Sequence, residues 1–99
     1  MYVIELIWRE AGDVREESDE AHLGRHGVTA DEFEEAFWSE PEWRAVGGRS
    51  ERLIGFGRTS SGRILMMVIE PWENSEGLWS PVTGRAATAR EKKRFPRLH

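Results

Sequence analysis

The sequence predicts a small α+β domain in which helices pack on one face of a mostly antiparallel sheet. Three observations lead to this fold class. The chain opens with a segment of period-2 alternation, two helix-start signals follow, and the second half alternates again around glycine-bearing turns. With 99 residues, of which 38% are hydrophobic and 10% aromatic, the chain has enough apolar surface for one core but hardly for two. We therefore expect a single domain over residues 1–99.

The first two elements expected are a strand over Tyr2–Trp8 and a helix that ends at Arg25. The strand segment alternates and is rich in β-forming residues. Asp13, followed three residues later by Glu16, has the spacing of a helix N-cap, although the apolar stripe after it is thin. Gly27 predicts the end of this helix, because glycine adopts the left-handed conformation after a helix without strain.

A second helix is expected directly after that glycine. Thr29 and Glu32 have the spacing of a capping box, in which each side chain accepts a hydrogen bond from a backbone N–H of the first turn. Val28 and Phe33 have the spacing of a hydrophobic staple. The helix is expected to end near Ser39, before a proline.

The next segments predict an antiparallel sheet. Trp43–Val46 is a candidate short strand, and Arg52–Arg58 alternates. A hairpin turn over residues 59–62 then leads into Arg63–Glu70, whose continuous apolar run indicates burial on both faces. We expect this last strand at the centre of the sheet.

The chain then predicts one more strand and a final helix. Leu78–Thr83 has a strand pattern, and Pro81 places it at an edge or at a bulge because proline cannot donate to a ladder. Thr88 and Glu91 repeat the capping-box spacing, which predicts a basic helix over Ala89–Phe95.

Composition excludes several classes of function. The chain has no cysteine, so disulfides, thiolate metal sites, iron–sulfur clusters and cysteine nucleophiles are all excluded. Its longest apolar run, Ile64–Ile69, is far shorter than the roughly 20 residues that cross a bilayer. The first eight residues lack the basic start of a signal peptide. We expect a cytoplasmic protein without a membrane association.

Charge is distributed unevenly along the chain. Residues 1–42 hold three Arg against thirteen Asp and Glu, a net charge of −10, whereas residues 43–99 hold eleven basic against five acidic residues, a net charge of +6. Such a chain could present a basic face to RNA or to an acidic protein. Two solvated surfaces without a partner are the alternative interpretation.

Several short motifs in a fixed order resemble the BrnT-like toxin family. They are Arg25-His26-Gly27-Val28-Thr29, Gly57-Arg58-Thr59, Gly62-Arg63 and Pro81-Val82-Thr83-Gly84-Arg85, followed by the segment Thr88–Phe95. The resemblance extends from about Val14 to Phe95. It implies a RelE-like fold, RNA cleavage without a metal, and neutralisation by an antitoxin encoded nearby. Arg25 stands where the family has a lysine, a departure that a non-catalytic relative of the same fold would explain.

Three residues are candidates for catalysis. Cleavage of RNA without a metal needs a proton acceptor, a proton donor and cations that stabilise the extra charge on the phosphorane. His26 is the candidate for proton transfer, with His22 one turn earlier on the same face. Arg85 and Arg58 are the candidate cations, because guanidinium groups bind phosphate in bidentate fashion. A helix-capping role for His26 and a solvated strand end for Arg58 are the structural alternatives.

Other cations are candidates for binding the RNA backbone, and one carboxylate has several possible roles. Glu91 is expected to cap the last helix, and alternatively to orient Arg85 or act as a base. We expect no cofactor and no metal, since the two histidines lack a third ligand. The predicted RNA-binding residues are Arg25, Arg63, Arg90, Lys92 and Lys93.

The function expected from these observations is that of a toxin component of a type II toxin–antitoxin system, acting as a metal-independent ribonuclease. Its partners would be RNA and a nearby-encoded antitoxin. The alternative is a non-catalytic protein-interaction module of the same fold. A homodimer is also possible if Leu78–Thr83 or Tyr2–Trp8 forms an exposed sheet edge, because free strand edges pair with other chains.

Overall fold

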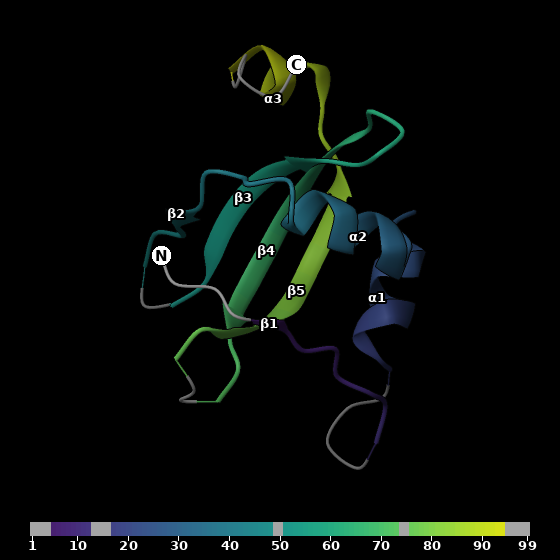
Figure 1. Cartoon of the computed structure of the whole chain (residues 1–99), viewed down its shortest axis with the longest axis vertical. Coiled ribbons are helices and arrows are strands. Elements are labelled where there is room, and N and C mark those ends of the chain that lie inside the picture. Colours follow the sequence, from purple (N-terminus) through teal and green to yellow (C-terminus); the bar gives the residue numbers. More distant parts are fainter. Residues whose placement is uncertain (1–4, 13–16, 49–50, 74–75, 95–99) are drawn as a thin grey trace.

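A computed structural model describes residues 5–12, 17–48, 51–73 and 76–94. The expected α+β fold with a mostly antiparallel sheet is confirmed, and Figure 1 shows the strands side by side with α2 in front of them. The strands form one five-stranded sheet in the order β1-β5-β4-β3-β2. In chain order the elements are β1 (Glu5–Leu6), α1 (Asp19–Arg25), α2 (Ala30–Phe37), β2 (Arg44–Ala45), β3 (Leu53–Arg58), β4 (Ile64–Pro71), β5 (Leu78–Ala86) and α3 (Ala89–Arg94).

The strand β4 lies at the centre of the sheet, as predicted from its apolar run. It pairs antiparallel with β3 on one side and with β5 on the other. The predicted hairpin over residues 59–62 connects β3 to β4, and Gly62 supplies its positive φ of 90°. β1 pairs with β5 in parallel, so the sheet is mixed at that edge.

The strand β5 is longer than predicted and is not an edge strand. It runs to Ala86, and β1 pairs with Leu78 and Trp79 on its outer side, so the first part of β5 is not a free edge. The bulge expected at Pro81 is confirmed. Val68 pairs with Thr83 whereas Ile69 pairs with Pro81, so one extra residue lies between these positions on β5.

The first helix is shorter than predicted. Asp13 and Glu16 lie outside the described residues, and α1 begins only at Asp19, where the Ser18 hydroxyl accepts the Ala21 N–H at 3.1 Å. Asp19 is also tied to the segment after β1, because its carboxylate accepts the backbone N–H of Arg9 at 2.7 Å. This tertiary contact places the start of α1, and the sequence pattern alone could not show it.

The turn between α1 and α2 follows the prediction. Gly27 has a φ of 78°, and the N–H groups of Gly27 and Val28 donate to the carbonyls of Gly24 and Leu23, both at 3.0 Å. These two bonds form a Schellman motif and end α1. The expected capping box of α2 is also present, with its hydroxyl and its carboxylate each accepting a backbone N–H at 3.1 Å.

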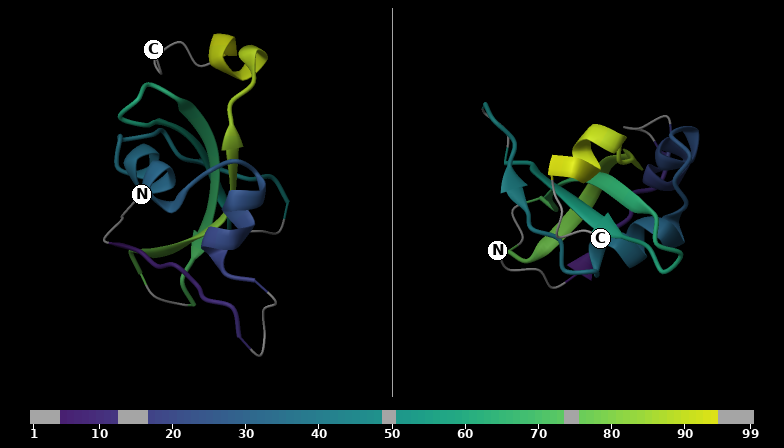
Figure 2. Two further views of the ribbon diagram at one scale, coloured as in Figure 1. Left: turned by 90° about the vertical axis from the view of Figure 1, so that its right-hand side faces the viewer. Right: turned by 90° about the horizontal axis from the view of Figure 1, so that it is seen from above.

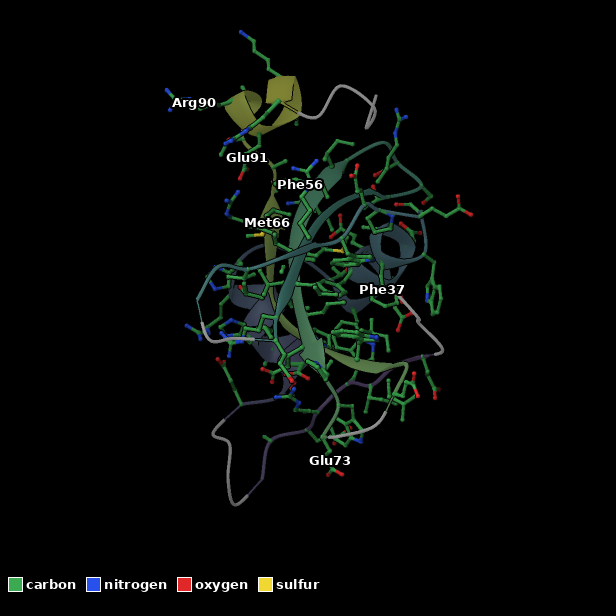
Figure 3. The ribbon with its side chains drawn as sticks, turned by 90° about the vertical axis from the view of Figure 1, so that its left-hand side faces the viewer. Phe37, Phe56, Met66, Glu73, Arg90 and Glu91 are labelled. Carbon is green, nitrogen blue, oxygen red and sulfur yellow. The ribbon has the colours of Figure 1, made fainter. Side chains whose placement is uncertain are left out.

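Two apolar clusters lie on opposite faces of the sheet. Figure 3 shows Phe37 on the side of α2 and Phe56 and Met66 on the other side. The cluster beneath the helices contains Leu6, Leu23, Val28, Phe33, Ala36, Phe37, Leu65, Met67 and Ile69. The cluster on the other face contains Phe56, Ile64, Met66 and Ala87. The prediction that the central strand is buried on both faces is therefore confirmed.

The helix α3 stands apart from these layers. None of its residues is buried. Figure 2 (left) shows it beyond the end of the sheet, after the extended segment that follows β5. It begins at Ala89 as predicted, and Phe95 lies outside the described residues. No helix in the part of the chain that the structure describes is long and apolar enough to cross a membrane.

Candidate nucleic-acid interface

The direction of Arg85 follows from the alternation of β5. A Cβ added to Gly84 would lie 3.2 Å from the side chains of Leu23 and Phe33, so this position faces the helices. The next residue points to the opposite face. Arg85 is paired in register with Met66, which belongs to the cluster on that opposite face. The Arg85 side chain therefore lies on the face that α1 and α2 do not cover.

A bidentate ion pair holds the Arg85 guanidinium. Its Nη1 and Nη2 atoms donate to Oε1 and Oε2 of Glu91 at 2.7 and 2.9 Å. Oε1 of Glu91 also accepts the backbone N–H of Thr88 at 2.8 Å. The hydrogen bond from Arg85, supported by that from Thr88, lowers the pKa of Glu91 from 4.5 to about 2. Glu91 thus both caps α3 and orients Arg85, which were two of the roles considered for it, and its low pKa disfavours the third role as a base.

The pairing leaves one side of the guanidinium available. Arg has five N–H donors, and Nη1 uses its second one on the carbonyl of Ala86 at 3.2 Å. The Nε–H and the remaining Nη2–H have no acceptor among the described residues. The Arg85 side chain is 42% exposed. Two adjacent donors on an exposed guanidinium form a fork that matches two phosphate oxygens.

Arg58 lies on the same face at the same end of the sheet. It pairs in register with Ile64, and strand alternation places its side chain on the same face as Phe56. Because β4 separates β3 from β5, the two strands that carry Arg58 and Arg85 are about 9.6 Å apart. The Ser39 hydroxyl accepts the backbone N–H of Arg58 at 3.0 Å and so fixes the end of β3 to the end of α2.

The helix α3 adds a group of cations beside Arg85. In Figure 3, Glu91 lies on the sheet side of α3 and Arg90 extends outward. The hairpin that follows Arg58 and the helix α3 both lie at the upper end of the sheet in Figure 1. We call this surface the basic end. It comprises Arg58, Arg85, Arg90, Lys92, Lys93 and Arg94, and apart from Arg85 none of these forms an ion pair with a described residue.

The predicted residues of α1 lie elsewhere. His26 is the exposed C-cap of α1, and its ring contacts that of His22 edge-to-face with 5.0 Å between centroids. Arg25 is bound through Nε to Glu17 at 3.0 Å. Both residues belong to the helix layer, whereas Arg85 lies on the other face. The structure therefore does not bring His26 and Arg85 to a common site.

Arg63 is turned toward the helices as well. Its Nη1 donates to the carbonyl of Gly27 and to Oε2 of Glu32, both at 2.9 Å. These bonds connect the start of β4 to the start of α2. The hydrogen bond from the Thr29 N–H, followed by that from Arg63, lowers the pKa of Glu32. Arg63 is thus already bound by protein groups on the helix side of the sheet, the face opposite to Arg85.

Two contacts that position candidate residues have no signal in the sequence. Ser39 fixes the end of β3 through a contact between residues 19 positions apart. Glu17 occupies the guanidinium of Arg25, although nothing in the spacing of the two residues pairs them in advance. Among the described residues, no group of three or more His, Asp or Glu side chains could hold a metal ion.

Comparisons of the chain with protein-family models, with curated proteins and with solved structures found no match.

Proposed function

We propose that this protein binds the backbone of RNA at the basic end, as the toxin component of a type II toxin–antitoxin pair with a RelE-like fold. The observation that carries the proposal is the collection of six cations at one end of the sheet, five of them without an ion-pair partner among the described residues. Arg85 adds a fork of two N–H donors that Glu91 holds in place. RNA fits because it supplies repeated phosphates to such a surface.

The number of cations sets the expected salt dependence. If about four phosphates of a single strand are neutralised, the logarithm of the binding constant falls with a slope of about −3 against the logarithm of the salt concentration. Affinity would then fall about 50-fold between about 50 and 200 mM salt. A site that reads bases through apolar contacts would show a much weaker dependence.

Binding can be tested with a labelled single-stranded RNA and fluorescence anisotropy. Arg85→Ala is expected to weaken binding about tenfold and to reduce the salt slope by about 0.7, because one phosphate contact is lost. Arg44→Ala is the matched control, since it removes one exposed Arg from the edge strand β2, which β3 and β4 separate from β5. Equal losses in the two variants, or none in either, would refute the proposed site.

Cleavage of the bound RNA is a separate proposal that rests on the resemblance to BrnT-like toxins. Arg85 and Arg58 would stabilise the charge on the phosphorane. His26, the candidate for proton transfer, lies in the helix layer and would have to act on a different part of the RNA or after a rearrangement. This separation favours the second candidate function, the non-catalytic protein-interaction module of the same fold.

An RNA digestion in a metal chelator distinguishes the two candidates. A metal-independent ribonuclease cuts the RNA under these conditions, and both Arg85→Ala and His26→Ala reduce the rate. A non-catalytic protein-interaction module leaves the RNA intact. Growth inhibition on induction, and its relief by the neighbouring gene product, would test the toxin and antitoxin roles in the cell.

A further inference from the structure

The end of α2 carries an exposed indole. Trp38, the C-cap residue of α2, is 52% exposed and is the only large hydrophobic side chain that is exposed in the described part of the chain. Its ring packs edge-to-face on Phe37, with 4.9 Å between centroids, and its Nε1 donates to Oε2 of Glu34 at 3.1 Å. The indole is therefore held in one orientation with much of its surface open to solvent.

Negative charge surrounds this indole. Glu34 and Glu35 precede Trp38 by four and three residues on α2, which places them on the same side of the helix. Among the described residues, Glu34 accepts hydrogen bonds only from the indole N–H groups of Trp8 and Trp38. Glu35 accepts from the backbone and hydroxyl of Ser60. All of these donors are neutral, so no described cation is bound to either carboxylate.

The C-terminal end of α2 adds to the negative electrostatic potential around the Trp38 indole. The last turn of α2 contains no basic residue, so its carbonyl groups present the negative end of the helix dipole beside the ring. Glu40 follows two residues later, is exposed, and has no ion-pair partner among the described residues. We call Trp38, Glu34, Glu35 and Glu40 the acidic indole patch. An aromatic ring framed by carboxylates attracts Lys and Arg side chains through cation–π and Coulomb interactions.

The helix α3 of the same chain carries exposed Lys and Arg side chains. Arg90, Lys92, Lys93 and Arg94 are exposed, and none pairs with a carboxylate of a described residue. None of the residues of α3 is buried, so the helix presents an exposed surface in the described part of the chain. The Arg85–Glu91 ion pair holds it beyond the end of the sheet. No hydrogen bond or salt bridge joins α3 to the acidic indole patch of its own chain within the described region.

We propose that α3 of one copy docks on the acidic indole patch of a second copy. Charge complementarity selects this occupant, because the exposed cations of α3 and the carboxylates of the acidic indole patch have opposite charges and neither group forms an ion pair with the other within one copy among the described residues. In a two-fold dimer, α3 of each copy docks on the patch of the other, so the contact is made twice. In a head-to-tail arrangement, each added copy makes the contact once. The contact area of one short helix is small, so the association is weak and depends on salt.

The association is tested by sedimentation velocity of the full chain at high protein concentration. At about 50 mM salt the average mass rises toward twice the monomer mass as the concentration increases, and at about 500 mM salt the protein is monomeric. Trp38→Ala weakens the association at least threefold, because the ring that faces the cations is lost. A protein that stays monomeric at every concentration and salt overturns the proposal.

A charge exchange makes the test specific for this pair of surfaces. One variant carries Lys92→Glu and Lys93→Glu, and the other carries Glu35→Lys and Glu40→Lys. Each variant alone is expected to be monomeric, since like charges then face each other in any copy-to-copy contact. A mixture of the two restores the association, because each acidic helix now meets a basic patch and each basic helix an acidic one.

The control variant carries Glu73→Lys and Glu76→Lys. These substitutions change the net charge by the same amount as Glu35→Lys and Glu40→Lys. Figure 3 shows Glu73 at the opposite end of the molecule from α3. This control is expected to associate as the unchanged protein does. If the control is monomeric as well, or if mixing the two charge-exchanged variants does not restore the dimer, net charge rather than the proposed contact governs the association and the proposal is wrong.

Discussion

Replacement of Glu91 by Gln tests the ion pair that holds α3 on the sheet. The variant keeps a side-chain oxygen that can accept the Thr88 N–H, so the capping box is retained. It removes the charge that binds both Nη atoms of Arg85. The difference between the two proteins therefore isolates the ion pair from the cap.

The size of the effect follows from the pKa of Glu91 and from its exposure. A pKa of about 2, against an ordinary value of 4.5, sets an upper limit of about 3.4 kcal/mol at about 1.36 kcal/mol for each pKa unit. Part of this limit belongs to the Thr88 N–H, which the variant keeps. Solvent screens the rest, since the Arg85 and Glu91 side chains are 42% and 23% exposed. We expect a loss of about 1 kcal/mol in the free energy of unfolding.

The effect must also depend on pH. The pKa of Glu91 is lower in the folded protein than in the unfolded chain, so the ion pair contributes fully above about pH 5. Its contribution is lost as the pH falls from there toward about 2, where the folded carboxylate becomes protonated. The unchanged protein and Glu91→Gln should therefore differ at pH 7 and converge at about pH 2.

Urea denaturation at a series of pH values measures this difference. Glu73→Gln is the control, since it removes an exposed carboxylate that makes no ion pair with a described residue. The reasoning is refuted if Glu91→Gln is as stable as the unchanged protein at pH 7, or if its deficit does not shrink on acidification. A double-mutant cycle with Arg85→Met should give a coupling energy of similar size, because neither variant alone retains the pair.

Three further substitutions test the packing, each by urea denaturation. Gly57→Ala should cost about 2–3 kcal/mol, because the added Cβ would lie 2.1 Å from the carbonyl oxygen of Ala36 and must push α2 from the sheet; an unchanged midpoint would contradict this close approach. Thr29→Ala should lower the free energy of unfolding by about 1 kcal/mol through loss of the α2 N-cap; an unchanged free energy of unfolding would contradict a stabilising cap. Met67→Ala should cost about 2–5 kcal/mol, since this side chain is fully buried; a smaller loss would indicate that the core collapses around the gap.

Local sequence signals predicted much of the fold. The capping box at Thr29, the glycine at position 27 and the apolar run of β4 are all confirmed, because each depends on residues that are close in the chain. The predicted start of the first helix near Asp13 was wrong, because the Ser18 cap and the contact between Asp19 and Arg9 fix the start of α1. The predicted end of the last strand at Thr83 was also wrong, because pairing with β4 extends β5 to Ala86.

The sequence predicted some residues of the candidate site correctly, but it did not show which of the candidates lie together. Arg85 and Arg58 share one face and one end of the sheet, as a common phosphate site requires. Arg63 and His26 belong to the helix layer instead. A one-residue step along a strand reverses the face of a side chain, so a list of basic residues in a sequence cannot tell which of them meet.

The sequence by itself determined the type and order of the elements and the division of charge between an acidic and a basic half, because propensity, capping and composition act over a few neighbouring residues. Only the tertiary structure decided which cations share a surface and which are bound by carboxylates. It also placed the exposed indole of Trp38 among acidic groups and α3 beyond the sheet. These relations depend on strand order, register and the closure of long loops, which bring together residues far apart in the chain.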